Sequence, residues 1–214
     1  MRVAMLDLSL YLVTDRGLAK GRSLTDIVGQ AVKGGVTCVQ LREKNCSTRE
    51  FIAQGKALRT VLHTTAVPLI INDRVDIALV VGAQGVHLGQ KDMSILDARN
   101  LAPHLIIGVS VENVDQALKA QAQGADYIGI SPVFLTPTKT DTAQALGLAG
   151  ITAIRQAVTL PMVGIGGIDA HNAAQVVQAG CDGIAVVSAL MAAHNPFQAA
   201  QELKNIVHLA KEKS

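Results

Sequence analysis

Aromatic side chains are scarce in this chain: they make up only 2% of its residues, and tryptophan is absent. Proteins that bind nucleic acid commonly stack bases on aromatic rings and present a basic surface. Here the rings are few and the net charge is only +2, so we expect no nucleic-acid partner. With 49% hydrophobic residues the chain can bury a sizeable core, which must be built mainly from Ala, Val, Ile and Leu.

Cysteine is also rare. Cys38, Cys46 and Cys181 are odd in number and lack metal-ligand spacing, which favours a reducing cytoplasmic location. No apolar run approaches the roughly 18 residues of a membrane span, and no basic segment with an apolar stretch and a cleavage site opens the chain. We therefore expect a cytoplasmic, unexported protein with no membrane partner. No segment resembles a linker, so residues 1–214 are expected to form one domain.

Four times, a helical pattern ends in glycine and is followed by an apolar strand. The four glycine–strand units are 34–40, 82–88, 124–130 and 180–187. Glycine suits the left-handed position just after a helix, and the apolar, β-branched-rich run suits a buried parallel strand. Further strands are expected at 8–13, 68–71, 105–109 and 161–165, with helices at 47–62, 113–123, 170–179 and 196–211.

Eight strands alternating with helices predict an α/β fold, a single-domain (β/α)8 TIM barrel with its active site at the C-terminal ends of the strands. An open doubly wound sheet is the alternative. That fold is disfavoured because no Gly-x-Gly-x-x-Gly follows the first strand; the sequence Gly164-Ile-Gly166-Gly167 lacks the third glycine and lies far down the chain.

The barrel prediction sorts the polar residues by strand end. Asp126 and Asp182 precede their strands, so we interpret them as structural residues of the opposite face. After the second strand, period-two alternation places Gln40, Arg42 and Lys44 on one face. Since the outer face packs on helices, these polar side chains are expected to point into the barrel mouth.

Two aspartates follow neighbouring strands. Asp73 comes after the third strand and Asp92 after the fourth, and two such carboxylates can face one Mg²⁺, whose shell is completed by water and substrate phosphates. Asp92 alone could instead cap the helix that begins near Ser94. His87 is interpreted as a core histidine or one that supports its neighbours.

Groups suited to anions recur at the other strand ends. The loop within Gly129–Lys139 combines prolines, threonines and a lysine. Ser110 ends the fifth strand, and Gly166-Gly167 and Val187-Ser188 follow the seventh and eighth, where barrels of this kind often bind phosphate. No Gly-x-Ser-x-Gly or Cys–His nucleophile is evident. Two anion sites and one metal site fit a reaction in which a diphosphate departs and a second phosphorylated substrate attacks.

Six motifs in this order resemble the thiamine phosphate synthase family, over residues 10 to about 203. They are Gln40-Leu-Arg-Glu-Lys44, Ile71-Asn-Asp-Arg74, His87-Leu-Gly-Gln90 with Asp92, the Gly129–Lys139 loop, Gly164-Ile-Gly-Gly-Ile168 and Val187-Ser188. The resemblance implies a Mg²⁺-assisted transferase of thiamine biosynthesis. It would join 4-amino-2-methyl-5-(diphosphooxymethyl)pyrimidine to thiazole phosphate, or to its carboxylated form, giving thiamine phosphate and pyrophosphate.

The same resemblance implies roles for individual residues. Arg42, Lys139 and Ser110 would be catalytic, and Asp73 and Asp92 would ligate Mg²⁺. The pyrimidine diphosphate would contact Gln40, Leu41, Arg42, Glu43, Lys44, Asn72, Ser110 and Lys139. The thiazole phosphate would contact Thr136, Pro137, Thr138, Gly167, Val187 and Ser188.

Three positions depart from the family pattern: Val111, Glu112 and Lys91. Two alternatives stay open, a thiazole tautomerase of the same barrel family and a non-catalytic sensor of phosphorylated ligands. The tautomerase needs neither metal nor diphosphate ligands, so Asp73, Asp92 and Lys139 favour the synthase. The expected partners are two small phosphorylated substrates, and a homo-oligomer stays open.

Overall fold

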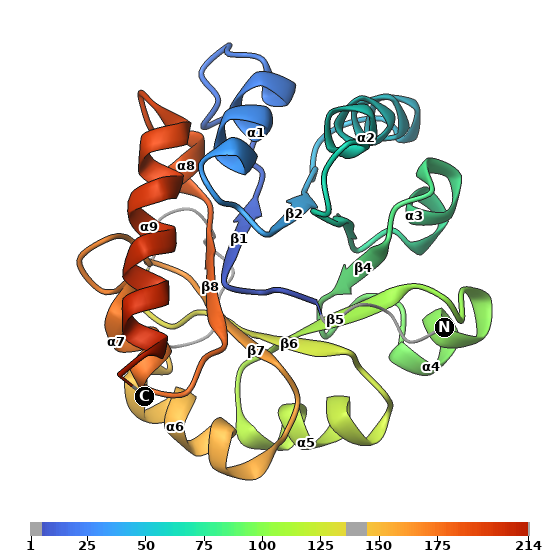
Figure 1. The fold of residues 1–214 in the computed structure, drawn as a ribbon. Helices are drawn as coiled ribbons and strands as arrows, with labels where there is room; N and C mark the ends of the chain where they lie inside the picture. The colour runs from blue at the N-terminus through green and yellow to red at the C-terminus, as the bar shows by residue number, and fades with distance from the viewer. Residues whose placement is uncertain (1–5, 136–144, 214) are drawn as a thin grey trace.

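The computed structural model describes residues 6–135 and 145–213. Its eight parallel strands pair in sequence order, and β8 pairs with β1, so the sheet is a closed barrel surrounded by helices (Figure 1). The strands are β1 (Leu10–Val13), β2 (Cys38–Leu41), β3 (Leu69–Asn72), β4 (Gly85–Leu88), β5 (Ile106–Val111), β6 (Tyr127–Ile130), β7 (Met162–Ile165) and β8 (Gly183–Val186). The predicted (β/α)8 barrel is confirmed.

The helices follow the strands as the sequence pattern indicates. They are α1 (Leu24–Lys33), α2 (Thr48–Leu62), α3 (Val75–Val81), α4 (Ile95–Leu101), α5 (Val114–Ala122), α6 (Gly147–Ala157), α7 (Ala173–Gln178), α8 (Ser188–Met191) and α9 (Pro196–Lys211). A capping box begins α2, where the side chains of Ser47 and Glu50 accept from each other's backbone N–H groups. No helix in the described part of the chain is long and apolar enough to cross a membrane.

Each of the four predicted units contains a glycine with the expected left-handed backbone; it is the first residue of three units, whereas in the unit 34–40 it is Gly35, because Gly34 has φ of -79°. Gly35, Gly82, Gly124 and Gly180 all have positive φ, between 69° and 122°, a region that favours glycine. Each lets the chain turn from a helix into the next strand. The predicted strand bounds differ from the observed ones by one or two residues. In β5 the difference concerns a site residue, since the strand extends to Val111 and Ser110 and Val111 pair with Gly129 and Ile130 of β6. Ser110 therefore lies within the strand instead of ending it.

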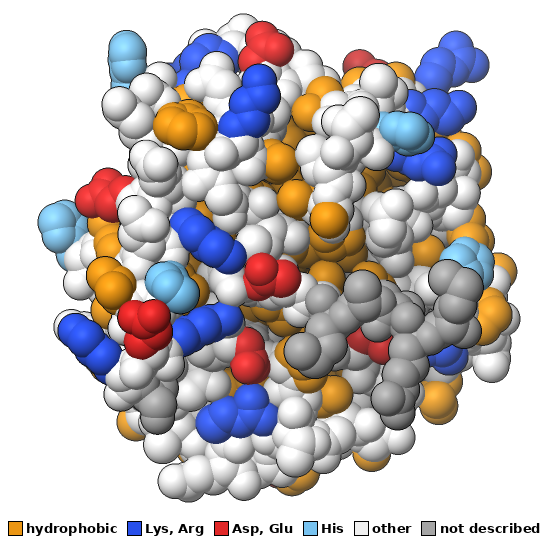
Figure 2. Space-filling model, viewed as in Figure 1, with side chains coloured by type: hydrophobic (Ala, Val, Ile, Leu, Met, Phe, Trp, Pro, Cys, Tyr) orange, Lys and Arg blue, Asp and Glu red, His pale blue; other side chains and the backbone are white. Residues whose placement is uncertain are grey.

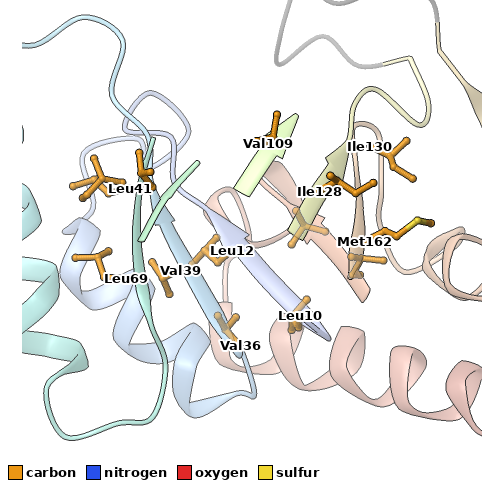
Figure 3. Close-up of a cluster of buried hydrophobic side chains, with 14 of the residues drawn as sticks. Leu10, Leu12, Val36, Val39, Leu41, Leu69, Val109, Ile128, Ile130 and Met162 are labelled. Atoms are coloured by element: carbon orange, nitrogen blue, oxygen red, sulfur yellow. The ribbon is translucent and has the colours of Figure 1, made fainter. Parts of the chain in front are cut away.

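Two apolar layers stabilise the barrel. The larger lies between the strands and the helices, and Figure 3 shows part of it, with Leu41, Leu69 and Met162 among its labelled members. A second cluster groups inward-facing residues of the strands, including Tyr11, Cys38 and Tyr127. Polar side chains at the C-terminal strand ends thus stand above an apolar interior.

Asp126 and Asp182 lie at the start of their strands, away from that end. The Asp126 carboxylate accepts the Ile107 N–H at 2.7 Å and pairs with Arg99 at 2.7 Å. The Asp182 carboxylate accepts the Met162 N–H at 2.8 Å and faces Arg155 at 3.5 Å. Figure 2 shows that basic and acidic side chains lie next to each other at several places on one face of the molecule. Both aspartates hold neighbouring strands together, as predicted.

Candidate active site

A cavity of about 520 Å³ opens at the C-terminal ends of the strands. Residues predicted as site residues form much of its wall: Gln40, Arg42, Lys44, Asn72, Asp73, Asp92, Ser110, Gly167, Val187 and Ser188. They come from β2, β3, β5 and the segments that follow β2, β3, β4, β7 and β8. Closure of the barrel brings together groups almost 150 residues apart in the sequence.

The end of β2 presents alternate side chains to the cavity. Gln40, Arg42 and Lys44 line it, as the period-two pattern predicts. Leu41 is fully buried in the layer beneath the helices (Figure 3). The Glu43 side chain is only 6% exposed and pairs with Arg16 at 3.5 Å. The side chains of Leu41 and Glu43 therefore turn away from the cavity, and a substrate contact at either residue would rest on backbone atoms.

Arg42 is positioned by the end of β1. Its backbone N–H donates to Thr14 Oγ1 at 3.1 Å, and its guanidinium Nη1 lies 4.0 Å from the Asp15 carboxylate. Thr14 is fully buried, so the anchor for the Arg42 backbone is fixed. The planar guanidinium carries five N–H donors in a geometry that matches phosphate.

Asp73 and Asp92 lie against each other at the cavity rim. Asp73 has a left-handed backbone, with φ of 62°, and its carboxylate accepts from Lys44 Nζ at 2.7 Å. The Asp92 carboxylate accepts the Gly89 N–H at 2.8 Å. Partial burial raises the pKa of the Asp92 carboxyl, and contact with the Asp73 carboxyl raises that pKa further. Two carboxylates this close repel each other when both are charged, and a cation between them would offset that repulsion.

This donor set fits Mg²⁺. Within residues 6–135 and 145–213, no group of three or more His, Cys, Asp or Glu side chains is arranged to hold a metal. Mg²⁺ usually takes one or two protein carboxylates and keeps several waters or substrate phosphate oxygens. A site with Asp73 and Asp92 therefore suits that ion better than metals that need three or four protein ligands.

Ser110 belongs to a hydrogen-bonded run across the cavity floor. Its Oγ lies 2.9 Å from His87 Nε2, and His87 Nδ1 lies 3.0 Å from the Tyr127 hydroxyl. That hydroxyl lies 2.8 Å from the Tyr11 hydroxyl, which accepts from Gln40 Nε2 at 2.9 Å. Sequence reasoning missed both tyrosines. Their inward parity on β1 and β6, in a chain with only two tyrosines, was the signal that could have found them.

Two glycines make room for this run. A Cβ on Gly108 would come within 2.0 Å of the Tyr127 ring, and one on Gly129 would lie 3.1 Å from His87 Cε1. Any larger side chain at Gly108 would displace the tyrosine ring. Gln90 belongs to one of the six motifs but was assigned no role from the sequence. It donates from Nε2 to the Ser110 carbonyl at 2.7 Å, which fixes the backbone beside the Ser110 hydroxyl.

The opposite wall of the cavity is formed by residues that were predicted to bind phosphate. Gly166 and Gly167 have φ of 106° and 64°, and Asn172 Nδ2 donates to the Gly167 carbonyl at 2.8 Å. Val187 and Ser188 lie beside them on the cavity. Four predicted residues, Thr136, Pro137, Thr138 and Lys139, lie outside the described residues.

Of the three departures from the family pattern, Lys91 and Glu112 line the cavity, whereas Val111 is buried in the outer core. Lys91 adds a cationic side chain next to Asp92 in the sequence. The backbone N–H of Glu112 donates to Gln116 Oε1 at 2.8 Å. None of the three replaces a predicted site residue.

Comparison with known proteins gives a consistent result. Residues 10–190 match the family model described as thiamine monophosphate synthase. The thiamine-phosphate synthase of Albidiferax ferrireducens is 53% identical over 201 residues, covering 94% of this chain and 92% of the relative. That of Chloroflexus aurantiacus is 50% identical over 210 residues, covering 98% and 97%. A solved structure described as thiamine phosphate pyrophosphorylase from Pyrococcus furiosus is 43% identical, with a TM-score of 0.89 and coverage of 96% and 98%.

Proposed function

The chain belongs to the thiamine monophosphate synthase family, and from that premise we propose that it joins a pyrimidine and a thiazole into thiamine phosphate. The substrates are 4-amino-2-methyl-5-(diphosphooxymethyl)pyrimidine and thiazole phosphate or its carboxylated form, and the second product is pyrophosphate. One observation carries this proposal: a single cavity holds Arg42, Lys44, the Asp73–Asp92 pair and the Gly167–Ser188 wall. That arrangement suits one diphosphate and one phosphate side by side.

The leaving diphosphate is assigned to the β2 side of the cavity. The C–O bond between the pyrimidine methylene and the diphosphate breaks first, and its electron pair leaves on the diphosphate oxygen. Arg42 and Lys44 stabilise the charge that develops there, together with Lys139 from the family motif. Fixed donors aimed at developing charge are among the largest contributions to catalysis. The pyrimidine methyl cation that remains is then captured by the thiazole nitrogen.

Asp73 and Asp92 would hold Mg²⁺. When bound, that ion neutralises negative charge on the diphosphate and so makes it a better leaving group. In the structure Lys44 Nζ donates a hydrogen bond to one carboxylate oxygen of Asp73. Lys44 therefore has two anionic partners within reach of its flexible side chain, the Asp73 carboxylate and the diphosphate that we assign to this side of the cavity.

The thiazole phosphate is assigned to the Gly167, Val187 and Ser188 wall. Gly167 combines left-handed backbone with the absence of a side chain, so its backbone can approach a ligand closely. Ser188 supplies a hydroxyl donor. Thr136 to Thr138 complete this subsite in the proposal. Because the phosphate is anchored there, the thiazole ring can face the reactive methylene across the cavity.

The tautomerase alternative is less well supported, since it gives no reason for two contacting carboxylates beside Arg42 and Lys44. A passive sensor likewise has no need of a leaving-group site. The three cysteines are unpaired in the structure, which supports the cytoplasm as the proposed compartment.

The direct test incubates the purified chain with both phosphorylated substrates and Mg²⁺. Thiamine phosphate and pyrophosphate are expected in equal amounts. Arg42→Ala is expected to lower kcat by about 10²–10³-fold, the usual effect of losing one such donor. Arg49→Ala is the matched control, because Arg49 is exposed at the start of α2 and does not line the cavity.

A fluorinated methyl group on the pyrimidine diphosphate tests the order of bond changes. If the cation forms before the thiazole attacks, electron withdrawal should slow single turnover by orders of magnitude with little loss of binding. Equal rates for the two substrates would refute this order. Absence of coupling, together with proton exchange into the carboxylated thiazole phosphate, would assign the chain to the tautomerase function.

A further inference from the structure

The cavity floor contains buried, hydrogen-bonded side chains to which the proposed reaction assigns no role. Five side chains form one run, in the order Gln40, Tyr11, Tyr127, His87 and Ser110, with contacts of 2.9, 2.8, 3.0 and 2.9 Å. The first four are 9% exposed or less. Ser110 is the member that is partly exposed, and it is the one assigned to the substrate.

Both phenols in this run stay protonated. Burial is the largest cause that raises the pKa of Tyr11 and of Tyr127 well above the usual value. Each hydroxyl therefore has one proton to donate and an oxygen that can accept. A run of such groups has only two consistent arrangements, one for each direction of donation.

Gln40 selects between the two directions. Its amide Nε2 can only donate, and it donates to the Tyr11 oxygen. Tyr11 can then donate to Tyr127, and Tyr127 to His87 Nδ1. In the neutral imidazole the other nitrogen must carry the proton, so His87 Nε2–H donates to Ser110 Oγ.

If donation ran in the reverse direction, the Tyr11 hydroxyl proton would have only a weak acceptor. Its oxygen would accept from both Gln40 and Tyr127, and its own proton would turn to Cys38, the neighbouring inward side chain on β2. Burial raises the pKa of the Cys38 thiol, so the sulfur stays a weak acceptor. An oxygen acceptor at Tyr127 is the better partner for that buried proton.

We propose that His87 is a positioning residue, held as the Nε2–H tautomer by Tyr127, so that Ser110 presents its hydroxyl proton to the substrate. Ser110 then has its one hydroxyl proton free to donate, and the group that receives this proton must be an acceptor. On an aminopyrimidine the acceptors are the ring nitrogens, whereas the amino group donates. The tautomer follows from the structure alone, and only the identity of the acceptor rests on the proposed function.

Nitrogen-15 NMR of the ligand-free protein tests the tautomer directly. Imidazole nitrogens that carry a proton and those that do not resonate far apart, and the His87 signals are identified by their loss in His87→Gln. We expect a protonated Nε2 and a bare Nδ1. Tyr127→Phe, which keeps the ring and removes the donor, is expected to redistribute the proton between the two nitrogens, while exposed His63 stays unchanged as the internal control.

A bare Nε2 with the proton on Nδ1 in the wild-type protein would overturn the proposal, and the His87→Gln variant serves here only to assign the signals. An unaltered His87 spectrum in Tyr127→Phe would also overturn it. Neither measurement involves turnover, so both keep their meaning if the chain fails to couple the two substrates.

Substrate analogues test the role of Ser110. Each of the two ring nitrogens is replaced in turn by C–H, and kcat/KM is compared between wild-type protein and Ser110→Ala. One analogue is expected to lose about two- to tenfold in the wild type, the usual effect of one neutral hydrogen bond, and to lose nothing further in Ser110→Ala. Equal losses in both proteins for both analogues would refute the donor role of Ser110, even where coupling itself is normal.

Discussion

Replacing Asp126 with alanine is expected to destabilise the barrel while leaving its chemistry intact. The Asp126 carboxylate joins two strands and a helix, since it accepts the Ile107 N–H at the start of β5 and pairs with Arg99 of α4. Arg99 also donates to the carbonyl oxygens of Pro103, Leu105 and Gly124. It therefore stays in place when the carboxylate is removed, and the Ile107 N–H is the group that loses its partner.

The cost follows from these two contacts. A partly buried N–H left without an acceptor costs about 1–3 kcal/mol. The ion pair adds only about 0–1 kcal/mol, because the Arg99 and Asp126 side chains are 31% and 46% exposed. A total near 2 kcal/mol corresponds to a fall in Tm of about 4–8 °C for a domain of this size.

Calorimetry and steady-state kinetics on the same variant test both halves of the prediction. kcat is expected to stay within about twofold of wild type, since Asp126 lies at the opposite end of the barrel from the cavity. Asp115→Ala, at an exposed position in the first turn of α5, is the matched control and is expected to change stability by less than about 0.5 kcal/mol. Loss of activity without loss of stability in Asp126→Ala would refute the division of the barrel into a stabilising and a catalytic end.

Two further predictions concern ionisable groups. Because the pKa of Asp92 is raised, its carboxyl holds a proton to higher pH than usual; Mg²⁺ affinity in the presence of pyrophosphate should therefore fall as pH is lowered from neutral through that pKa. Asp92→Asn should bind Mg²⁺ weakly at every pH. A Mg²⁺ affinity of the wild-type protein that does not change with pH in calorimetry would contradict the prediction. Thiol titration of the folded protein should detect Cys46 alone among the three cysteines, because Cys38 and Cys181 are buried and burial raises the pKa of Cys181 to about 12. Equal labelling rates for all three would show that these sites open readily.

The fold and the direction of the β2 side chains were predictable because both depend on short-range periodicity. Gln40 and Arg42 lie two residues apart in an extended segment, so their side chains share a face. Because both are polar, that face could not be the outer one that packs on helices. The glycines after the helices mark turns for equally local reasons. These are properties of the chain that hold before any tertiary contact forms.

The cavity floor was not predictable in the same way. The contact between the Tyr11 and Tyr127 hydroxyls joins residues 116 positions apart, and it depends on the stagger of the strands around the closed barrel. Space for the Tyr127 ring comes from Gly108, whose role as a neighbour is visible only when β5 and β6 are in register. The motif at Gln40–Lys44 also concealed that Leu41 and Glu43 turn away from the cavity, since a contiguous motif does not separate side-chain from backbone roles.

The pairing of β1 with β8 has a consequence for how this chain emerges from the ribosome. β1 is among the first elements to be synthesised, yet its partner on one side, Gly183–Val186, follows some 170 residues later, and the outer cover of this seam includes α9, which packs against α1 and α7. Translation proceeds at roughly 5–20 residues per second, so β1 keeps an open edge for about 10–30 s. Throughout that interval the nascent sheet can recruit a foreign strand, and a holdase that shields residues 10–13 would be most useful then and redundant once synthesis has passed residue 211.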